Sequence, residues 1–381
     1  MRRSVLLALL VAVSLPLALE GAASGAAAQG YPKQKAGFAP KGMPAKGPAT
    51  KGQGELRPGP LPWVDMHMHL VPARGDFSGA VAEALRLMDR AGISTAVVMP
   101  TPQSPPSYSE REYVQILRRH PGRFVWFGGG GDLNHIIHRT DPGKVTGAVQ
   151  KDFAAKAEAI LDAGARGFGE MAVLHISMMA GHPFEETRAD HPLYLALADV
   201  AGARGAVISM HIDLVPTDGP TPAKVVALGN PRRLRGNVAG FERLLAHNRK
   251  ARFVLEHVGA DPVGHASLEL LSRLVDQHSN LYLAIRAAPG TSTDMQNLIV
   301  DTKGILPEWR EFFVRRADRF LFGTDSFMVA PGAGSGPGVS FAARNVNKLI
   351  LHNRILAALP PEVARKIAID NPRALLGLPA P

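Results

Sequence analysis

The chain has 381 residues, a net charge of +10 and 46% hydrophobic residues, enough for one large α/β domain or two ordinary ones. It contains no cysteine, which excludes disulfides, thiolate metal ligands and a cysteine nucleophile. Any metal site must therefore use histidine and carboxylate side chains. Beyond the N-terminal segment there is no run of 18 or more apolar residues, so no later segment is expected to span a membrane.

Residues 1–28 have the features of a secretory signal. Arg2 and Arg3 give a basic start, residues 5–19 are almost wholly apolar, and residues 26–28 are three alanines at a suitable cleavage point. We expect cleavage, and hence a secreted or periplasmic protein without a membrane anchor. An uncleaved anchor is the alternative.

Residues 29–60 are rich in Gly, Pro, Ala and Lys and predict a flexible linker. Residues 1–60 contain eight basic and two acidic residues, which leaves a net charge of only +4 for the remainder. Because the charge is concentrated in the N-terminal segments, we expect a small-molecule substrate and no nucleic-acid partner. Residues 61–381 are predicted to form a single catalytic domain, and a homo-oligomer is compatible with the sequence.

From residue 61 onward, short apolar runs alternate with amphipathic helical segments. Helix patterns occupy residues 80–90, 153–163, 193–203, 241–249, 266–278 and 309–316, and glycine follows several of them, as at Gly92 and Gly164. Eight such units predict an α/β fold of the (β/α)8 TIM-barrel type. No glycine-rich fingerprint follows the first strand, which disfavours a dinucleotide-binding fold. The predicted strands are Trp63–His67, Ser94–Met99, Phe124–Phe127, Ala165–Glu170, Ala206–His211, Phe253–His257, Leu281–Arg286 and Phe320–Thr324.

Residues of metal-binding type follow several of these strands. The carboxyl ends of barrel strands meet at one mouth, where active sites lie. His67 and His69 follow the first strand and, two residues apart, point the same way. The other candidates are Glu170 after the fourth strand, His211 after the fifth, His257 after the sixth and Asp325 after the eighth. Together these positions predict a metal centre.

This pattern resembles the amidohydrolase superfamily. The phrase Val64-Asp65-Met66-His67-Met68-His69 is close to that family's form, and residues 367–377 look like the closing helix of its amidohydrolase-related branch. The resemblance extends over residues 61–378. It implies a hydrolase in which a metal-activated water attacks an ester, lactone or amide of a small molecule.

The resemblance also implies roles for the candidate residues. His67, His69, His211 and Asp325 would hold one divalent ion, with zinc the expected metal. Asp325 would accept the proton of the attacking water. His257 would either bind a second ion or hold the water and polarise the substrate.

Glu170 departs from the commoner pattern of the family, which has a carboxylated lysine or no ligand after strand four. Its phrase Gly167-Phe168-Gly169-Glu170 looks more like the glutamate with which TatD-type deoxyribonucleases bridge two ions. A site for one or two ions is therefore expected. In the two-ion arrangement Glu170 bridges, His67, His69 and Asp325 hold the first ion, and His211 and His257 hold the second. An ion pair with Arg166 is the alternative for Glu170.

Other polar residues are candidates for lesser roles. Arg286 ends the seventh strand and could bind a substrate carboxylate in a bidentate manner, with a structural ion pair as the alternative. Residues 128–131, all glycine, are predicted to give backbone freedom beside the site. His175, His182 and His191 lie in or near the loop after strand four, and most are expected at the surface.

Three other functions compete with hydrolysis. Non-oxidative decarboxylation would be recognised by CO₂ release without net addition of water. A TatD-like phosphodiesterase is suggested by Glu170 alone and would need a basic channel. A non-catalytic binding protein is disfavoured by the complete ligand set. No Gly-x-Ser-x-Gly elbow supports a serine hydrolase.

Overall fold

The computed structural model describes residues 55–73, 75–103, 108–178, 182–288, 295–331, 335–336 and 339–379. The predicted signal segment and residues 29–54 of the predicted linker lie outside the described residues. In the last part of that linker Leu56 is buried, and Asn353 donates a 2.8 Å hydrogen bond to the carbonyl of Arg57. Packed chain therefore begins before the predicted boundary at residue 61.

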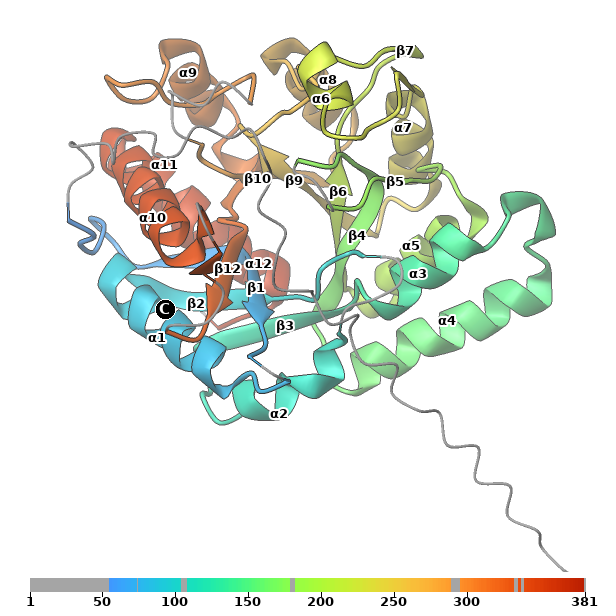
Figure 1. The fold of residues 1–381 in the computed structure, drawn as a ribbon, viewed down its shortest axis with the longest axis horizontal. Coiled ribbons are helices and arrows are strands. Elements are labelled where there is room, and N and C mark those ends of the chain that lie inside the picture. The colour runs from blue at the N-terminus through green and yellow to red at the C-terminus, as the bar shows by residue number, and fades with distance from the viewer. Residues whose placement is uncertain are drawn as a thin grey trace, which may run out of the picture. The chain divides into compact units, whose positions relative to one another are not determined.

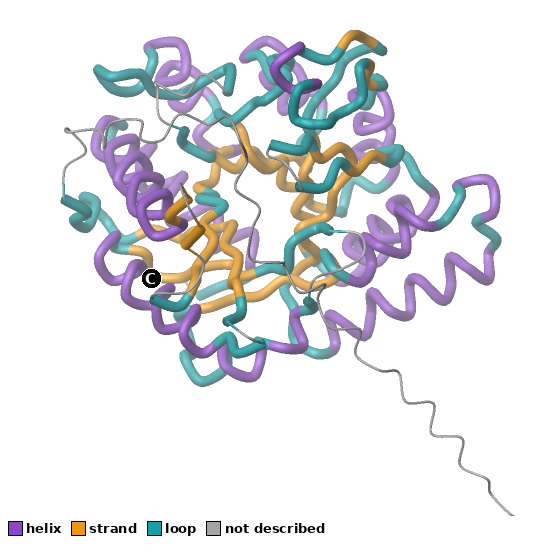
Figure 2. The backbone as a smooth tube through the Cα atoms, in the orientation of Figure 1, coloured by secondary structure: helices purple, strands orange, loops and turns teal. Residues whose placement is uncertain are grey.

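Eight parallel strands close into a barrel, which confirms the predicted fold class. The strand order is β11-β10-β9-β6-β4-β3-β2-β1, and β1 pairs with β11 through Asp65 and Phe322 to complete the ring. Figure 2 shows this ring of strands with the helices outside it. The barrel strands are β1 (Trp63–Val71), β2 (Ile93–Val98), β3 (Phe124–Gly129), β4 (Gly167–His175), β6 (Val207–Ile212), β9 (Arg252–Val258), β10 (Leu281–Ile285) and β11 (Phe320–Phe322).

All six predicted helix segments form helices, and they surround the strands (Figure 1). Gly92 ends α1 in the left-handed conformation, as its position after the helix pattern predicts. Among the described residues no helix is both long and apolar enough to cross a membrane. The helices are α1 (Ser78–Ala91), α2 (Val114–Leu117), α3 (Asp132–Arg139), α4 (Gly147–Asp162), α5 (Pro192–Arg204), α6 (Ala223–Val226), α7 (Val238–His247), α8 (Leu268–Gln277), α9 (Pro307–Arg315), α10 (Phe341–Ala358), α11 (Pro361–Arg365) and α12 (Asn371–Leu376), with shorter helical turns at 110–112, 142–144, 317–319 and 366–370.

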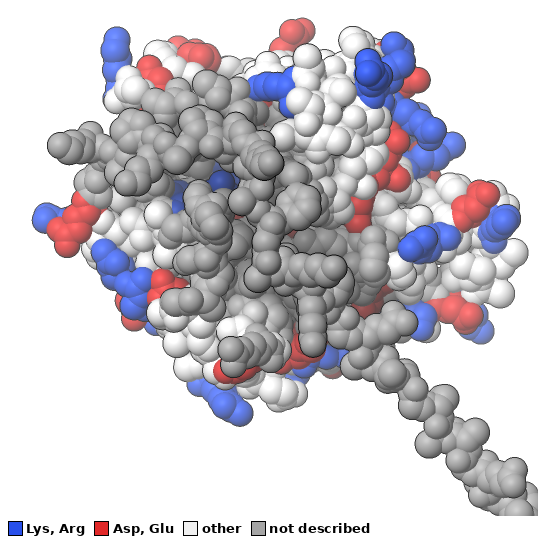
Figure 3. Space-filling view, viewed as in Figure 1, with Lys and Arg blue, Asp and Glu red and all other residues white. Residues whose placement is uncertain are grey.

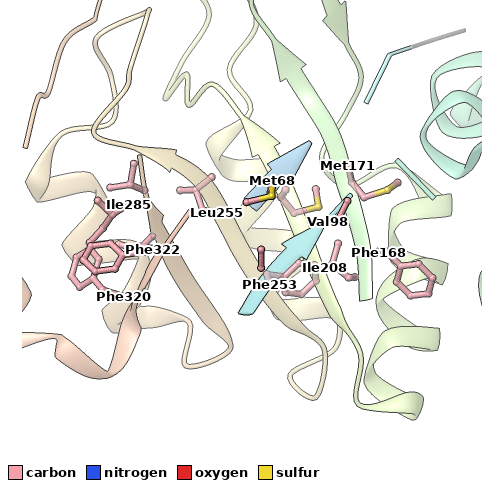
Figure 4. Close-up of a cluster of buried hydrophobic side chains, with 14 of the residues drawn as sticks. Met68, Val98, Phe168, Met171, Ile208, Phe253, Leu255, Ile285, Phe320 and Phe322 are labelled. Atoms are coloured by element: carbon pink, nitrogen blue, oxygen red, sulfur yellow. The ribbon is translucent and has the colours of Figure 1, made fainter. Parts of the chain in front are cut away.

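Alternate residues of the strands enter two separate hydrophobic clusters. Phe253, Leu255 and Ile285 belong to the large cluster between strands and helices, part of which Figure 4 shows. Val254 and Ala284, their neighbours in sequence, belong to a smaller cluster that also contains Leu375 and Leu376 of α12. This alternation places the smaller cluster inside the barrel. The C-terminal helix α12 therefore covers one end of the interior, which leaves the other end for the site.

The segments that follow the strands contain short strands of their own. The longest addition is β12 (Ser326–Val329), which pairs in parallel with β1 beyond the end of β11. This strand lies next to His69, because His69 pairs in register with Phe327. The others are β5 (Glu185–Glu186), β7 (Gly219–Pro220), β8 (Arg233–Leu234), β13 (Ser335–Gly336) and β14 (Val339–Ser340).

Candidate metal centre

The first strand changes its facing just before the two histidines. Val64 and Met66 point into the barrel interior, whereas Met68 lies in the helix-facing cluster, and the pairing of β1 with β2 is irregular between Asp65 and Met68. This irregularity lets His67 and His69 both face the mouth although Met66 faces inward.

Asp65 holds this part of β1 against the segment after β11. Its buried carboxylate accepts hydrogen bonds from the backbone N–H of His67 (3.2 Å), the backbone N–H of Thr324 (2.9 Å) and the hydroxyl of Thr324 (2.7 Å). Asp65 is therefore occupied as an acceptor and orients the metal-binding residues on both segments rather than binding an ion itself.

The two histidines turn their Nε2 atoms toward each other. His69 Nδ1 lies 2.9 Å from the carbonyl oxygen of Met99, which can only accept, so this nitrogen carries a proton. His67 Nδ1 lies 3.0 Å from Glu256 Oε2, although the two atoms are not aligned for a hydrogen bond. The two Nε2 atoms are 2.9 Å apart, so one of them donates a hydrogen bond to the other. A metal ion bound by both nitrogens would replace that proton.

Glu170 divides its two carboxylate oxygens between two pairs of histidines. Oε2 lies 3.2 Å from His69 Nε2 and 3.6 Å from His67 Nε2, while Oε1 lies 2.7 Å from His211 Nδ1 and 2.9 Å from His257 Nε2. The described partners of Glu170 are thus histidines and not Arg166, the alternative considered from the sequence.

Gly130 allows the backbone of Glu170 to come close to the neighbouring strand connection. A Cβ atom at Gly130 would lie 2.6 Å from the Glu170 nitrogen, 2.8 Å from its carbonyl oxygen and 2.7 Å from the carbonyl oxygen of Pro100. A side chain at this position would therefore displace Glu170. The predicted backbone freedom applies to Gly129, whose φ is 85°, whereas Gly130 is needed for lack of space.

The charge state of the site follows from this crowding. Burial alone would raise the pKa of Glu170, but the nearby His67 and His211 outweigh it and hold the pKa well below its usual range. Burial and the nearby His211 lower the pKa of His257 to about 3, so this imidazole is neutral at physiological pH. Glu170 is therefore an ionised carboxylate and His257 a neutral nitrogen donor, the forms in which both bind metal ions. Against the effect of burial, the nearby carboxylates raise the pKa of His211 to about 10 and that of His67 well above its usual range, so metal binding must displace a proton from each.

Asp325 lies between β11 and β12 and faces the same two histidines. Its backbone N–H donates a 2.9 Å hydrogen bond to the carbonyl of His67, and its Oδ1 lies 3.6 Å from His69 Nε2 and 3.9 Å from His67 Nε2. Its other oxygen, Oδ2, lies 2.8 Å from Arg286 Nε and 3.5 Å from Lys348 Nζ. The carboxylate therefore turns one oxygen to the histidines and the other to two cations.

The donor set fits a divalent ion. His67, His69 and Asp325 form one group whose ligand atoms all lie within 4.8 Å of one another, and His67, Glu170 and His257 form a second. Ligand atoms of a tetrahedral zinc site with bonds of about 2.0–2.1 Å lie about 3.4 Å apart. The separations of 2.9, 3.6 and 3.9 Å in the first group lie on both sides of that value.

His211 lies beside Glu170 but belongs to neither of these groups. Its Nε2 lies 3.5 Å from Asp213 Oδ2, so Asp213 turns Nδ1 toward Glu170. The ring of His175 lies 4.6 Å from that of His211, centroid to centroid, and His182 lies 4.6 Å beyond His175. His175 is therefore buried at the mouth rather than exposed.

The two remaining candidates, His191 and Arg286, both make structural contacts. His191 is fully buried rather than at the surface: its Nδ1 accepts a hydrogen bond from the backbone of Leu193 at the start of α5, and its Nε2 contacts the carbonyl of Thr140. Arg286 forms an ion pair with Asp325, which is the alternative considered from the sequence. Binding of a substrate by Arg286 stays a prediction.

Several residues of the site escaped the sequence reasoning. Glu256 could have been identified from the sequence, because a carboxylate directly after the apolar residues Val254 and Leu255 needs a buried partner. That partner is His67 on one oxygen and Ser209, which donates a 2.7 Å hydrogen bond, on the other. Lys348 gave no local signal, since it lies in a helix that the sequence pattern did not predict.

A closed eight-stranded barrel with histidines and carboxylates gathered at its mouth defines the class of metal-dependent TIM-barrel enzymes. The family model for amidohydrolases matches residues 64–378. The chain belongs to the amidohydrolase family and is a metal-dependent hydrolase. No curated protein matches the chain.

Solved structures of similar architecture share little sequence with the chain. An uncharacterized TIM-barrel protein from Bordetella bronchiseptica is 18% identical, with a TM-score of 0.48, and the match covers 83% of this chain and 99% of that one. Dihydroorotase from Saccharomyces cerevisiae in complex with 5-fluoroorotic acid is 13% identical, with a TM-score of 0.47 and 85% of each chain covered. Amidohydrolase 2 from Bifidobacterium longum subsp. infantis is 12% identical, with a TM-score of 0.42, over 84% of this chain and 100% of that one.

Proposed function

We propose that this protein is an exported hydrolase that uses zinc to cleave an ester, lactone or amide bond of a small molecule. The observation that carries the proposal is the pair of Nε2 atoms of His67 and His69, 2.9 Å apart, each with its other ring nitrogen held by an acceptor. Two buried ring nitrogens that face each other at this distance are suited to bind one metal ion in place of a proton.

His67, His69 and Asp325 would hold the first ion, and Glu170, His211 and His257 would complete a site for a second. The split of Glu170, with Oε2 toward His67 and His69 and Oε1 toward His211 and His257, supports a bridging carboxylate. When bound, such ions lower the pKa of a water molecule and polarise the bond to be cleaved.

The chain's own residues would supply the remaining steps. Asp325 Oδ1, which faces both Nε2 atoms, would take the proton of the attacking water. If the site holds one ion, His257 remains free to orient the substrate. On the described part of the face in Figure 3, lysines and arginines lie interspersed with aspartates and glutamates.

The experiment is metal analysis combined with a substrate screen. We expect at least one zinc per chain in the wild type, and loss of both metal and turnover in the variant His67→Ala/His69→Ala. The screen covers lactones, esters, amides, a phosphodiester and aromatic carboxylates, the last followed by CO₂ release. Full turnover by metal-free protein would reject the proposal, and CO₂ release or phosphodiester cleavage would move it to the alternative function.

The number of ions is tested with Glu170→Gln under matched metal loading. A fall from two ions to one supports the bridging role. One tightly bound ion in both proteins would reject it and leave His257 a purely catalytic role.

A further inference from the structure

The cations beside the metal centre outnumber the carboxylates that they contact. Arg286, at the end of β10, and Lys348, on α10, both approach the single oxygen Oδ2 of Asp325, at 2.8 and 3.5 Å. Among the described residues, Asp325 is the one carboxylate paired with either cation. Lys348 Nζ also donates to the main-chain carbonyl of Asp325.

Helix α10 is fixed against the outside of the barrel by residues on the same face as Lys348. One turn before it, Asn345 donates a 2.8 Å hydrogen bond to the carbonyl of Phe327 and accepts one of 3.2 Å from its N–H. One turn after it, buried His352 contacts the carbonyl of Ile285 at 3.0 Å, next to Arg286. The helix is thus attached both to β12 and to the end of β10, which holds the two cations in place together.

Both cations keep unused hydrogen-bond donors. The Nε of Arg286 is buried and makes no well-aligned hydrogen bond, although Asp325 Oδ2 is close. Its two terminal nitrogens have no hydrogen-bond partner in the described part of the chain, and its side chain is 21% exposed. Lys348 is 15% exposed and has three N–H groups, of which Asp325 takes only part.

We propose that Lys348 and Arg286 form a subsite for a carboxylate group of the substrate, beside the metal centre. Once Asp325 shares its charge with a metal ion, two cations remain with too little negative charge to balance them. An oxyanion with two acceptor oxygens matches the planar donors of Arg286 and the point charge of Lys348. This inference rests on the proposed function, because Asp325 belongs to both sites, and it restricts the substrate to a carboxylate-bearing ester, lactone or amide.

The test measures binding of benzoate and of its neutral counterpart benzamide to the metal-loaded full chain by calorimetry. We expect benzoate to bind at least tenfold more tightly than benzamide. Lys348→Met and Arg286→Met should each weaken benzoate binding by about ten- to a hundredfold, as expected for loss of a charged hydrogen bond. Lys348→Arg should recover most of the affinity. The control is Arg344→Met, an exposed cation on the same helix, which should change it by less than twofold.

Three results would overturn the proposal. Benzoate binding that persists in both methionine variants would mean that the carboxylate binds the metal alone. Loss of metal in the variants in proportion to the loss of benzoate would assign both cations to support of Asp325. Absence of benzoate binding to the wild type would remove the subsite. None of these measurements requires turnover, so failure of the proposed hydrolysis is recognised separately.

Discussion

Glu256 offers a sharp test of how the metal centre is built. Its Oε2 lies 3.0 Å from His67 Nδ1, and its Oε1 accepts a 2.7 Å hydrogen bond from Ser209. In Glu256→Gln, the hydroxyl of Ser209 can accept a hydrogen bond from the amide NH₂ and donate to Met99 Sδ, 3.5 Å away. The amide oxygen can then still face His67 Nδ1, so the substitution removes chiefly the negative charge beside this ring.

The cost of losing this charge can be estimated from the role of the contact. The carboxylate beside His67 Nδ1 favours a proton on that nitrogen and leaves Nε2 for the ion. Loss of such a partner of a metal-binding histidine costs about ten- to a hundredfold in metal affinity, or about 1.4–2.8 kcal/mol. Glu256→Gln should therefore weaken zinc binding by that factor while the fold is retained.

A second substitution separates this explanation from general damage. Ser209→Ala removes the hydrogen bond to Oε1 but keeps the carboxylate beside His67, so most of the zinc affinity should remain. The assay is competition with a chromophoric chelator, with thermal unfolding of the metal-free proteins as the control for folding. Zinc affinity of Glu256→Gln within twofold of wild type, or an equal loss in Ser209→Ala, would refute the reasoning.

Three further predictions concern other parts of the chain. Gly130→Ala should lower the free energy of unfolding by about 1–3 kcal/mol because its Cβ would meet the backbone of Glu170. The matched control is Gly147→Ala, whose Cβ would have nothing within 4 Å. Equal effects of the two substitutions in chemical denaturation would contradict the packing argument. Asp190→Asn should cost about 1 kcal/mol at pH 7, because ion pairs with Arg188 and Arg243 lower the pKa of Asp190 to about 2. Since this pKa lies below the ordinary 3.8, the stabilisation is present above about pH 4 and disappears as the pH falls toward about 2, so urea unfolding curves of the two proteins should converge there; a constant difference would speak against the ion pairs. N-terminal sequencing of the native protein should begin near residue 29, and an intact Met1 would argue against export with cleavage.

The barrel itself was accessible from the sequence because its determinants are local. Each buried parallel strand needs a short run of β-branched and aliphatic residues, and each helix needs an apolar stripe. Alternation of the two, from Trp63 to Phe322, leaves few other ways to bury these surfaces. The convergence of His67, Glu170 and Asp325 at one mouth follows from that topology.

The tertiary structure decided what local patterns do not encode. The change of facing between Met66 and Met68 depends on pairing with β2, and the position of Asp65 depends on Thr324, 259 residues away. The division of the two Glu170 oxygens, the carboxylate behind His67 and the approach of Lys348 from α10 are likewise contacts between distant segments. The direction of a side chain at such contacts is set by packing across the closed barrel. The sequence alone therefore determines which residues reach the mouth. The tertiary fold determines which of their atoms meet there.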